Sequence, residues 1–229
     1  QEEHLLRGTL AHAFFEAIGR GMDAEKAKLL VMEAFERIQD VPQWQLRFKL
    51  DEFSTLLDRA REWARQSEVN QELAGVEIPV GVRVSEEVRI GGYMDRLLRD
   101  GEGNYLVVDL KTGRSKPAKK EGEDHVQLMT YQLALAHGAF DGHQVHDGEG
   151  MPRQGGVLVY PGATTKKIGE IWQSDKSPEA LEEFAALLPP LVEEMRGPRI
   201  TARTNKDCDK CPIRSICPVQ EEGRMTTDA

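Results

Sequence analysis

The most constraining feature of this sequence is a short apolar run, YLVVDL at Tyr105–Leu110, that contains a single charged residue. A strand with apolar residues on both faces belongs inside a sheet that is covered on both sides. Burying a carboxylate there without a partner is costly, so Asp109 needs a neighbour that compensates its charge. The run therefore predicts a strand that is buried on both faces of its sheet, and a functional reason for Asp109.

The first third of the chain, 1–74, is predicted to be helical. One amphipathic helix is expected at Arg7–Ile18, where helical spacing relates Leu6, Leu10, Ala13, Phe14 and Ala17. Two further helices are expected at about 23–38, ending before Pro42, and at about 50–72. The amino-terminal region should therefore pack as a helical layer.

From Gly75 the pattern changes to short β-branched runs separated by Gly and Pro. Strands are expected near 76–84, 87–98 and 105–111, in GGVLVYP and in IGEIWQ, and helices near 124–138 and 178–196. A Gly- and His-rich segment, 141–154, is interpreted as a loop. We predict one domain, 1–196, composed of a helical part (1–74), a sheet with its helix (75–172) and a packing helix (178–196), followed by a cysteine-containing tail, 197–229.

The charge balance limits which partners the chain can bind. The sequence has 39 acidic and 30 basic residues and a formal net charge of −9, which argues against a general nucleic-acid coat. It leaves open a protein that meets nucleic acid locally and uses carboxylates to hold metal. Neither a membrane-length apolar run nor an amino-terminal signal segment is present, so a cytoplasmic protein without a membrane partner is expected.

Asp109 and Lys111 should lie on the same side of their strand, because side chains alternate with period two. A carboxylate that binds a divalent cation, next to a lysine that steadies phosphate or water, is a hydrolytic pair. A hairpin through the turn Gly101–Asn104 would bring Asp95 beside Asp109. Two converging carboxylates repel unless a cation lies between them.

Two helices supply further polar groups. His12 lies on the first helix with Glu16 one turn away, and imidazole with carboxylates suits Mg²⁺ or Mn²⁺. Glu16 is a candidate for orienting His12 or a bound water. Gln127 and Tyr131, at i and i+4, present two hydrogen-bonding groups on one helix face. His125, His137, His143 and His146 have no assigned partner and are interpreted as surface groups.

Four segments, GTLAHAFFE, GGYMDR, VVDLKTG and QLMTYQLAL, occur in an order that closely resembles the nuclease module of RecB-type helicase-nucleases. The resemblance extends to the AddA/AddB and AdnA/AdnB subunits and to Cas4-like exonucleases, all of the PD-(D/E)XK superfamily. It covers about residues 5 to 217. It implies a restriction-endonuclease-like α/β fold with a mixed central sheet flanked by helices.

The resemblance also implies roles for individual residues. His12, Asp95, Asp109 and the Leu110 carbonyl would bind Mg²⁺ or Mn²⁺, and Lys111 would be the catalytic lysine. Gln127 and Tyr131 match the QxxxY motif that supports the site and DNA. The segment between Leu110 and Lys120 contains several basic residues and no acidic one. The residues expected to contact DNA are Arg114, Lys116, Lys119 and Lys120.

The three cysteines, Cys208, Cys211 and Cys217, form a C-x2-C-x5-C pattern. In AddB-like and Cas4-like nucleases such a triplet joins an upstream cysteine to hold a [4Fe-4S] cluster. This chain has no fourth cysteine. Either the sequence begins after that cysteine or the cluster site is degenerate.

The leading hypothesis is a metal-dependent DNA nuclease domain, expected to be an exonuclease, of a RecB-like helicase-nuclease in double-strand break repair and recombination. Its partners would be DNA, single-stranded or at a duplex end, and a helicase motor in the same polypeptide or complex. One alternative is a free-standing Cas4-like nuclease for CRISPR adaptation. Another is a non-catalytic DNA-binding scaffold.

Overall fold

The computed structural model describes residues 2–116, 118–138, 150–197 and 202–221. Contacts divide the chain into two units, 1–185 and 186–229, which are described separately. His143, His146 and most of the predicted 141–154 loop lie outside the described residues. Within the part of the chain that the structure describes, every helix is too short or too polar to span a bilayer.

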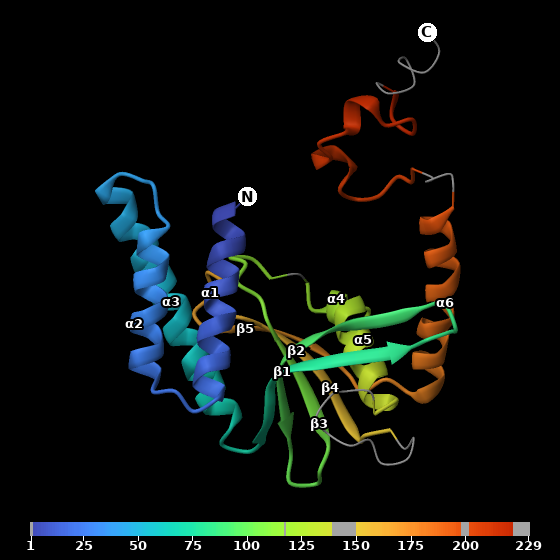
Figure 1. The fold of residues 1–229 in the computed structure, drawn as a ribbon, viewed down its shortest axis with the longest axis horizontal. Coiled ribbons are helices and arrows are strands. Elements are labelled where there is room, and N and C mark those ends of the chain that lie inside the picture. Colours follow the sequence, from blue (N-terminus) through green and yellow to red (C-terminus); the bar gives the residue numbers. More distant parts are fainter. Residues whose placement is uncertain (1, 117, 139–149, 198–201, 222–229) are drawn as a thin grey trace. The chain divides into compact units, whose positions relative to one another are not determined.

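The first unit is built on a mixed five-stranded sheet (Figure 1). In spatial order its strands are β1 (Glu72–Arg83), β2 (Arg89–Arg99), β3 (Tyr105–Leu110), β4 (Arg153–Tyr160) and β5 (Gly169–Gln173). All neighbouring pairs are antiparallel except β3 and β4, which are parallel. A parallel connection needs a crossover, and this one contains α4 (Lys120–Glu123) and α5 (Val126–Ala136).

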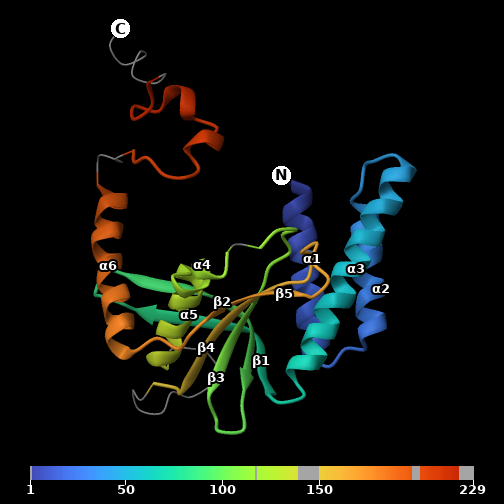
Figure 2. The same cartoon turned by 180° about the vertical axis from the view of Figure 1, so that it is seen from behind.

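Helices cover both faces of the sheet, as the sequence predicts. On one face α1 (Glu2–Gly19), α2 (Ala24–Arg37) and α3 (Gln43–Ser67) share a core with Leu106, Val108 and Leu110. On the other face α5 and the start of α6 (Pro178–Arg196) pack against Val107 and Leu158. Figure 2 shows α3 from behind, beside the loop between β4 and β5, and Arg59 donates hydrogen bonds to three carbonyls of that loop.

Several predicted details of the helical layer were wrong. The buried face of α1 runs through Ala11, Phe14 and Phe15, whereas Leu6 and Ala13 are exposed. The third helix begins seven residues earlier than expected, directly after Pro42, and ends at Ser67. β1 starts at Glu72 rather than near 76, because Glu72 pairs with Arg99 and so extends the hairpin.

The segment after β3 contains the short helix α4, which precedes the helix predicted near 124–138. Gly122 in this helix lies so close to the backbone of Trp172 that a side chain would clash there. Close approach of the two backbones explains a glycine at this position. The helix ends just before α5 and so sets the entry of the chain into that helix.

The second unit contains the remainder of α6 and two short 3-10 helices, Cys208–Lys210 and Arg214–Ile216. Arg203 bonds both carboxylate oxygens of Glu194, at 2.8 and 2.7 Å. The three cysteines are half-buried free thiols. No described residue of this unit after α6 is fully buried, so this part of the tail has no apolar core of its own.

Candidate active site

Two neighbouring strands bring the predicted acids together. β2 and β3 pair antiparallel with Arg96 opposite Val108, a register that sets Asp95 against Asp109. The Asp95 Oδ2 accepts a hydrogen bond of 2.7 Å from the backbone N–H of Leu110. Both carboxylates are buried, Asp109 with 1% of its surface exposed. The predicted hairpin geometry is therefore present.

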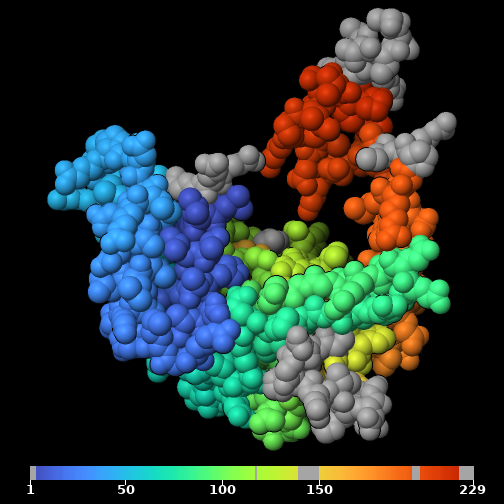
Figure 3. All heavy atoms as spheres, in the orientation of Figure 1, coloured from blue at the N-terminus to red at the C-terminus, as the bar shows by residue number. Residues whose placement is uncertain are grey.

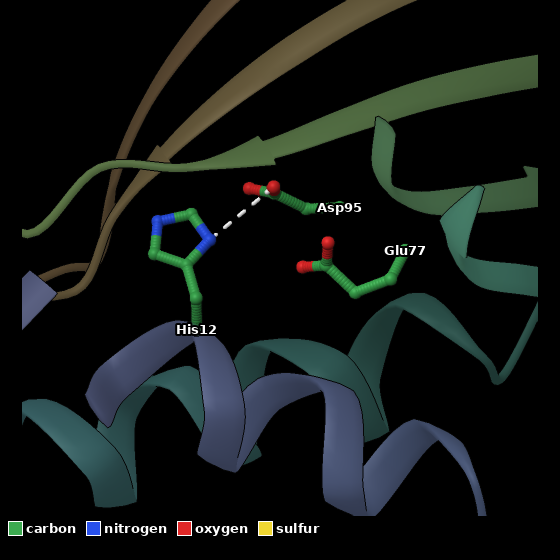
Figure 4. Close-up of side chains that lie close together, drawn as sticks. All are labelled: His12, Glu77 and Asp95. Atoms are coloured by element: carbon green, nitrogen blue, oxygen red, sulfur yellow. Dashed lines mark ion pairs between the residues drawn. The ribbon is translucent and has the colours of Figure 1, made fainter. Parts of the chain in front are cut away.

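A second acid, which the sequence reasoning missed, completes a cluster around Asp95. His12 Nδ1 on α1 lies 3.2 Å from Asp95 Oδ1. One ligand atom each of His12, Glu77 and Asp95 lies within 4.8 Å of the others, and all three side chains point into one space (Figure 4). Among the described residues this is the one such group of histidine, cysteine and acidic side chains.

Glu77 lies in β1, where its backbone adopts a φ of 47°. This left-handed conformation is strained for a residue with a side chain, and such strain concentrates at functional positions. A signal for it existed in the sequence: like Asp109, Glu77 is an acid inside an apolar β run, VEIPV.

The Asp109 carboxylate faces a different set of partners. Its Oδ2 lies 2.7 Å from the Lys111 ammonium, and its Oδ1 accepts a hydrogen bond of 2.6 Å from the Gln127 amide. Lys111 donates to Gln127 Oε1 at 2.6 Å. Gln127 also donates to the Tyr131 hydroxyl at 2.9 Å, and Tyr131 donates to the Tyr93 carbonyl at 2.6 Å. Gln127 and Tyr131 of α5 thus form one connected hydrogen-bond network with Asp109 and Lys111.

The electrostatics of the site are those of crowded acids. Burial, reinforced by repulsion from Asp95, raises the pKa of Asp109 to about 6 despite the nearby Lys111. Burial and the Asp95 charge also raise the pKa of Glu77. For His12, burial favours the neutral ring, but the Asp95 hydrogen bond and the surrounding carboxylates outweigh burial and raise the pKa. The site therefore attracts positive charge.

The cluster around Asp95 opens onto a cleft of about 580 Å³ between α1, β1 and β2. Figure 3 shows the dark blue surface of α1 beside the green surface of β1. His12, Glu77 and Asp95 line the cleft, as does Glu16, whose carboxylate pairs with Arg20 at 2.8 Å rather than with His12. Leu110 contributes to the site by donating its backbone N–H to Asp95.

His125, interpreted from the sequence as a surface group, is instead half-buried at the start of α5. Burial and the positive charge of Lys111 lower its pKa. Of the predicted basic patch, Arg114 pairs with Glu52, and Lys116, Lys119 and Lys120 are exposed. The cysteines line a separate cavity of about 440 Å³ in the second unit.

Carboxylates and an imidazole converge on one point, next to an Asp–Lys pair at a strand end, which is the arrangement that metal-dependent phosphodiester hydrolysis requires. Residues 1–218 match the family model of the PD-(D/E)XK nuclease superfamily, and the chain belongs to that superfamily. Its mixed sheet with flanking helices is the expected restriction-endonuclease-like α/β fold.

Two other comparisons add less. A solved structure described as "Crystal structure of SSO0001" is similar at 17% identity, covering 92% of this chain and 85% of that chain, with a TM-score of 0.42. The comparison with curated proteins found no match.

Proposed function

We propose that the protein hydrolyses DNA as a Mg²⁺- or Mn²⁺-dependent deoxyribonuclease. The observation that carries this proposal is the convergence of His12, Glu77 and Asp95 beside the Asp109–Lys111 pair. Membership of a nuclease superfamily supports the same reaction class. DNA as the substrate follows from the resemblance to RecB-type nucleases and from the basic segment after β3.

The donor set fits a hard divalent cation. Carboxylate oxygens from Glu77, Asp95 and Asp109 suit Mg²⁺, and the imidazole of His12 suits Mn²⁺ better. The Leu110 carbonyl is proposed as a backbone ligand. When bound, such a cation supplies a Lewis acid that neutralises the scissile phosphate and makes water more acidic. Burial is the main cause of the raised pKa values of Glu77 and Asp109, and repulsion from Asp95 adds to it, so a bound cation would relieve that repulsion.

The remaining residues position the reacting groups. Lys111 holds its ammonium between Asp109 and Gln127, where it can orient the attacking water or steady the phosphate. Gln127 fixes both of those side chains, because its amide bridges them. Burial raises the pKa of Tyr131 to about 12, so its hydroxyl stays protonated and acts as an anchor to Tyr93.

The biological setting is a finer proposal. The order of the four motifs supports an exonuclease domain of a RecB-like helicase-nuclease in double-strand break repair, working with a helicase motor in the cytoplasm. Arg114, Lys116, Lys119 and Lys120 are the proposed DNA contacts. The three cysteines support a [4Fe-4S] cluster only if a fourth ligand completes the set.

The test is degradation of linear DNA with Mg²⁺ or Mn²⁺ by the unaltered protein and by the Asp109→Ala and Lys111→Ala variants. Activity should require the metal and should fall by about 100-fold or more in either variant. Glu86→Gln is the matched control, because it removes an exposed acid outside the cleft. DNA binding without cleavage in every sample would favour the scaffold instead.

A further inference from the structure

A second concave surface lies next to the metal cleft, beside α1 and the start of α3. Two adjoining cavities of about 300 and 330 Å³ share Arg7, Phe48, Glu52 and Arg114 in their walls. They therefore form one continuous groove. Figures 1 and 2 show α1 and α3, which supply most of these residues, side by side. None of the residues proposed for catalysis lines this groove.

Two aromatic side chains stand in this groove without being buried. Trp44 is 71% exposed and Phe48 is 60% exposed. They are four residues apart on α3, so they project from the same helix face. Flat apolar rings that line a groove and remain open to water offer stacking surfaces for flat ligands.

The groove is basic although the protein as a whole is acidic. Arg7, Lys49, Arg59 and Arg114 line it, against two acidic residues, Asp51 and Glu52. Glu52 is already paired with Arg114. Arg59 is held by carbonyls of the β4–β5 loop, so its guanidinium is a fixed part of the wall. Cations interleaved with aromatic rings match a ligand that alternates phosphates with bases.

The groove also continues toward the metal cleft. His4 on α1 lines both the groove and the cleft that contains His12. On the other side, Thr112 lines the cleft and Arg114 lines the groove, and these residues are one and three positions after Lys111 in the chain. A chain-like ligand lying in the groove would therefore have one end directed at the candidate active site.

We propose that this groove binds single-stranded DNA, with bases stacked on Trp44 and Phe48 and phosphates near Arg7 and Arg114. Base faces are free to stack on aromatic side chains only when they are not stacked within a duplex. The inference rests on the proposed nuclease function and names its substrate as an unpaired strand. It assigns to α3 the capture of that strand.

Binding is tested in EDTA, where no cleavage occurs, with oligothymidylate as the probe. The protein has three tryptophans, of which Trp63 is 6% exposed and Trp172 is 49% exposed. Trp172→Phe therefore leaves Trp44 as the one exposed indole. Oligothymidylate should quench its fluorescence, and a duplex of equal length should quench it far less.

Affinity measurements supply the second arm. Trp44→Ala and Phe48→Ala should each weaken oligothymidylate binding by about 10-fold, and duplex binding should change by less than about twofold. Trp172→Ala is the matched control, because it removes an exposed indole that does not line the groove. Circular dichroism and thermal unfolding should show that these surface variants remain folded.

The two proposals fail in different ways. Unchanged oligothymidylate affinity in a folded Trp44→Ala/Phe48→Ala variant, or no quenching of Trp44, would overturn the groove assignment and leave metal-dependent cleavage untouched. Loss of binding in that variant, together with no cleavage by the unaltered protein under any metal, would support the groove and refute the nuclease proposal.

Discussion

Replacing Glu77 by glycine is expected to stabilise the metal-free protein while removing one ligand of the proposed metal site. At a φ of 47°, Glu77 pays a conformational cost of roughly 1–2 kcal/mol that glycine does not pay. Glycine in a strand costs about 0.5–1 kcal/mol in backbone entropy. The net gain is about 0.5–1 kcal/mol, and removing the repulsion between Glu77 and Asp95 acts in the same direction.

The assay is thermal unfolding in EDTA and in excess Mn²⁺. A ligand at 100 times its dissociation constant stabilises the folded state by about 2.7 kcal/mol, which is several degrees for a chain of this size. The unaltered protein should show this increase and Glu77→Gly should lose most of it. Glu77→Gln is the matched control, because it removes the charge but retains the strained backbone. Lower stability of Glu77→Gly in EDTA, together with an unchanged response to Mn²⁺, would refute the reasoning.

Three further outcomes follow from the site and from the charge. The pKa of Asp109 rises from 3.8 to about 6 on folding, so its stabilising contribution is complete below 3.8 and is lost as the pH increases through 6. In EDTA the unfolding free energy of the unaltered protein should therefore decline over this pH range by up to about 3 kcal/mol more than that of Asp109→Asn. Parallel curves of unfolding free energy against pH for the two proteins would contradict this expectation. Tyr131→Phe should lower the free energy of unfolding by about 1–2 kcal/mol, because it leaves the Tyr93 carbonyl without its donor. In DNA cleavage kinetics this variant should show a fall in kcat that is larger than its rise in KM. A change in KM alone would exclude the anchoring role. DNA binding in EDTA should weaken steeply with salt. The double substitution Lys119→Gln/Lys120→Gln should reduce the slope of log binding constant against log salt concentration by about 2. Nanomolar affinity at physiological salt would be inconsistent with an acidic domain that relies on a local basic patch.

Parts of the site that depend on short sequence spacing were predictable. Asp109 and Lys111 meet at 2.7 Å because residues two apart in an extended segment share a side. Gln127 and Tyr131 meet at 2.9 Å because residues four apart in a helix share a face. The apolar run of β3 likewise required a covered sheet, and the sheet is covered on both faces.

Parts that depend on how separate elements are aligned were not predictable. The period of α1 alone suggested Leu6 and Ala13 as core residues, but the sheet and neighbouring helices select the face with Ala11 and Phe15. The sequence pattern of a helix defines its apolar stripe only to within about one residue's rotation around the helix axis. Packing against neighbouring elements decides which edge of that stripe is buried.

By itself, the sequence determined the fold class, the Asp–Lys pair and the order of the motifs, because these depend on the spacing of residues along single helices and strands. Only the tertiary structure decided that Glu77 joins His12 and Asp95, and that Asp109 bonds Gln127. Those contacts depend on the register between β1 and β2 and on where helices lie on the sheet. Register depends on the hydrophobic patterns of both strands together with the geometry of their turn, so no pattern within one strand contains it.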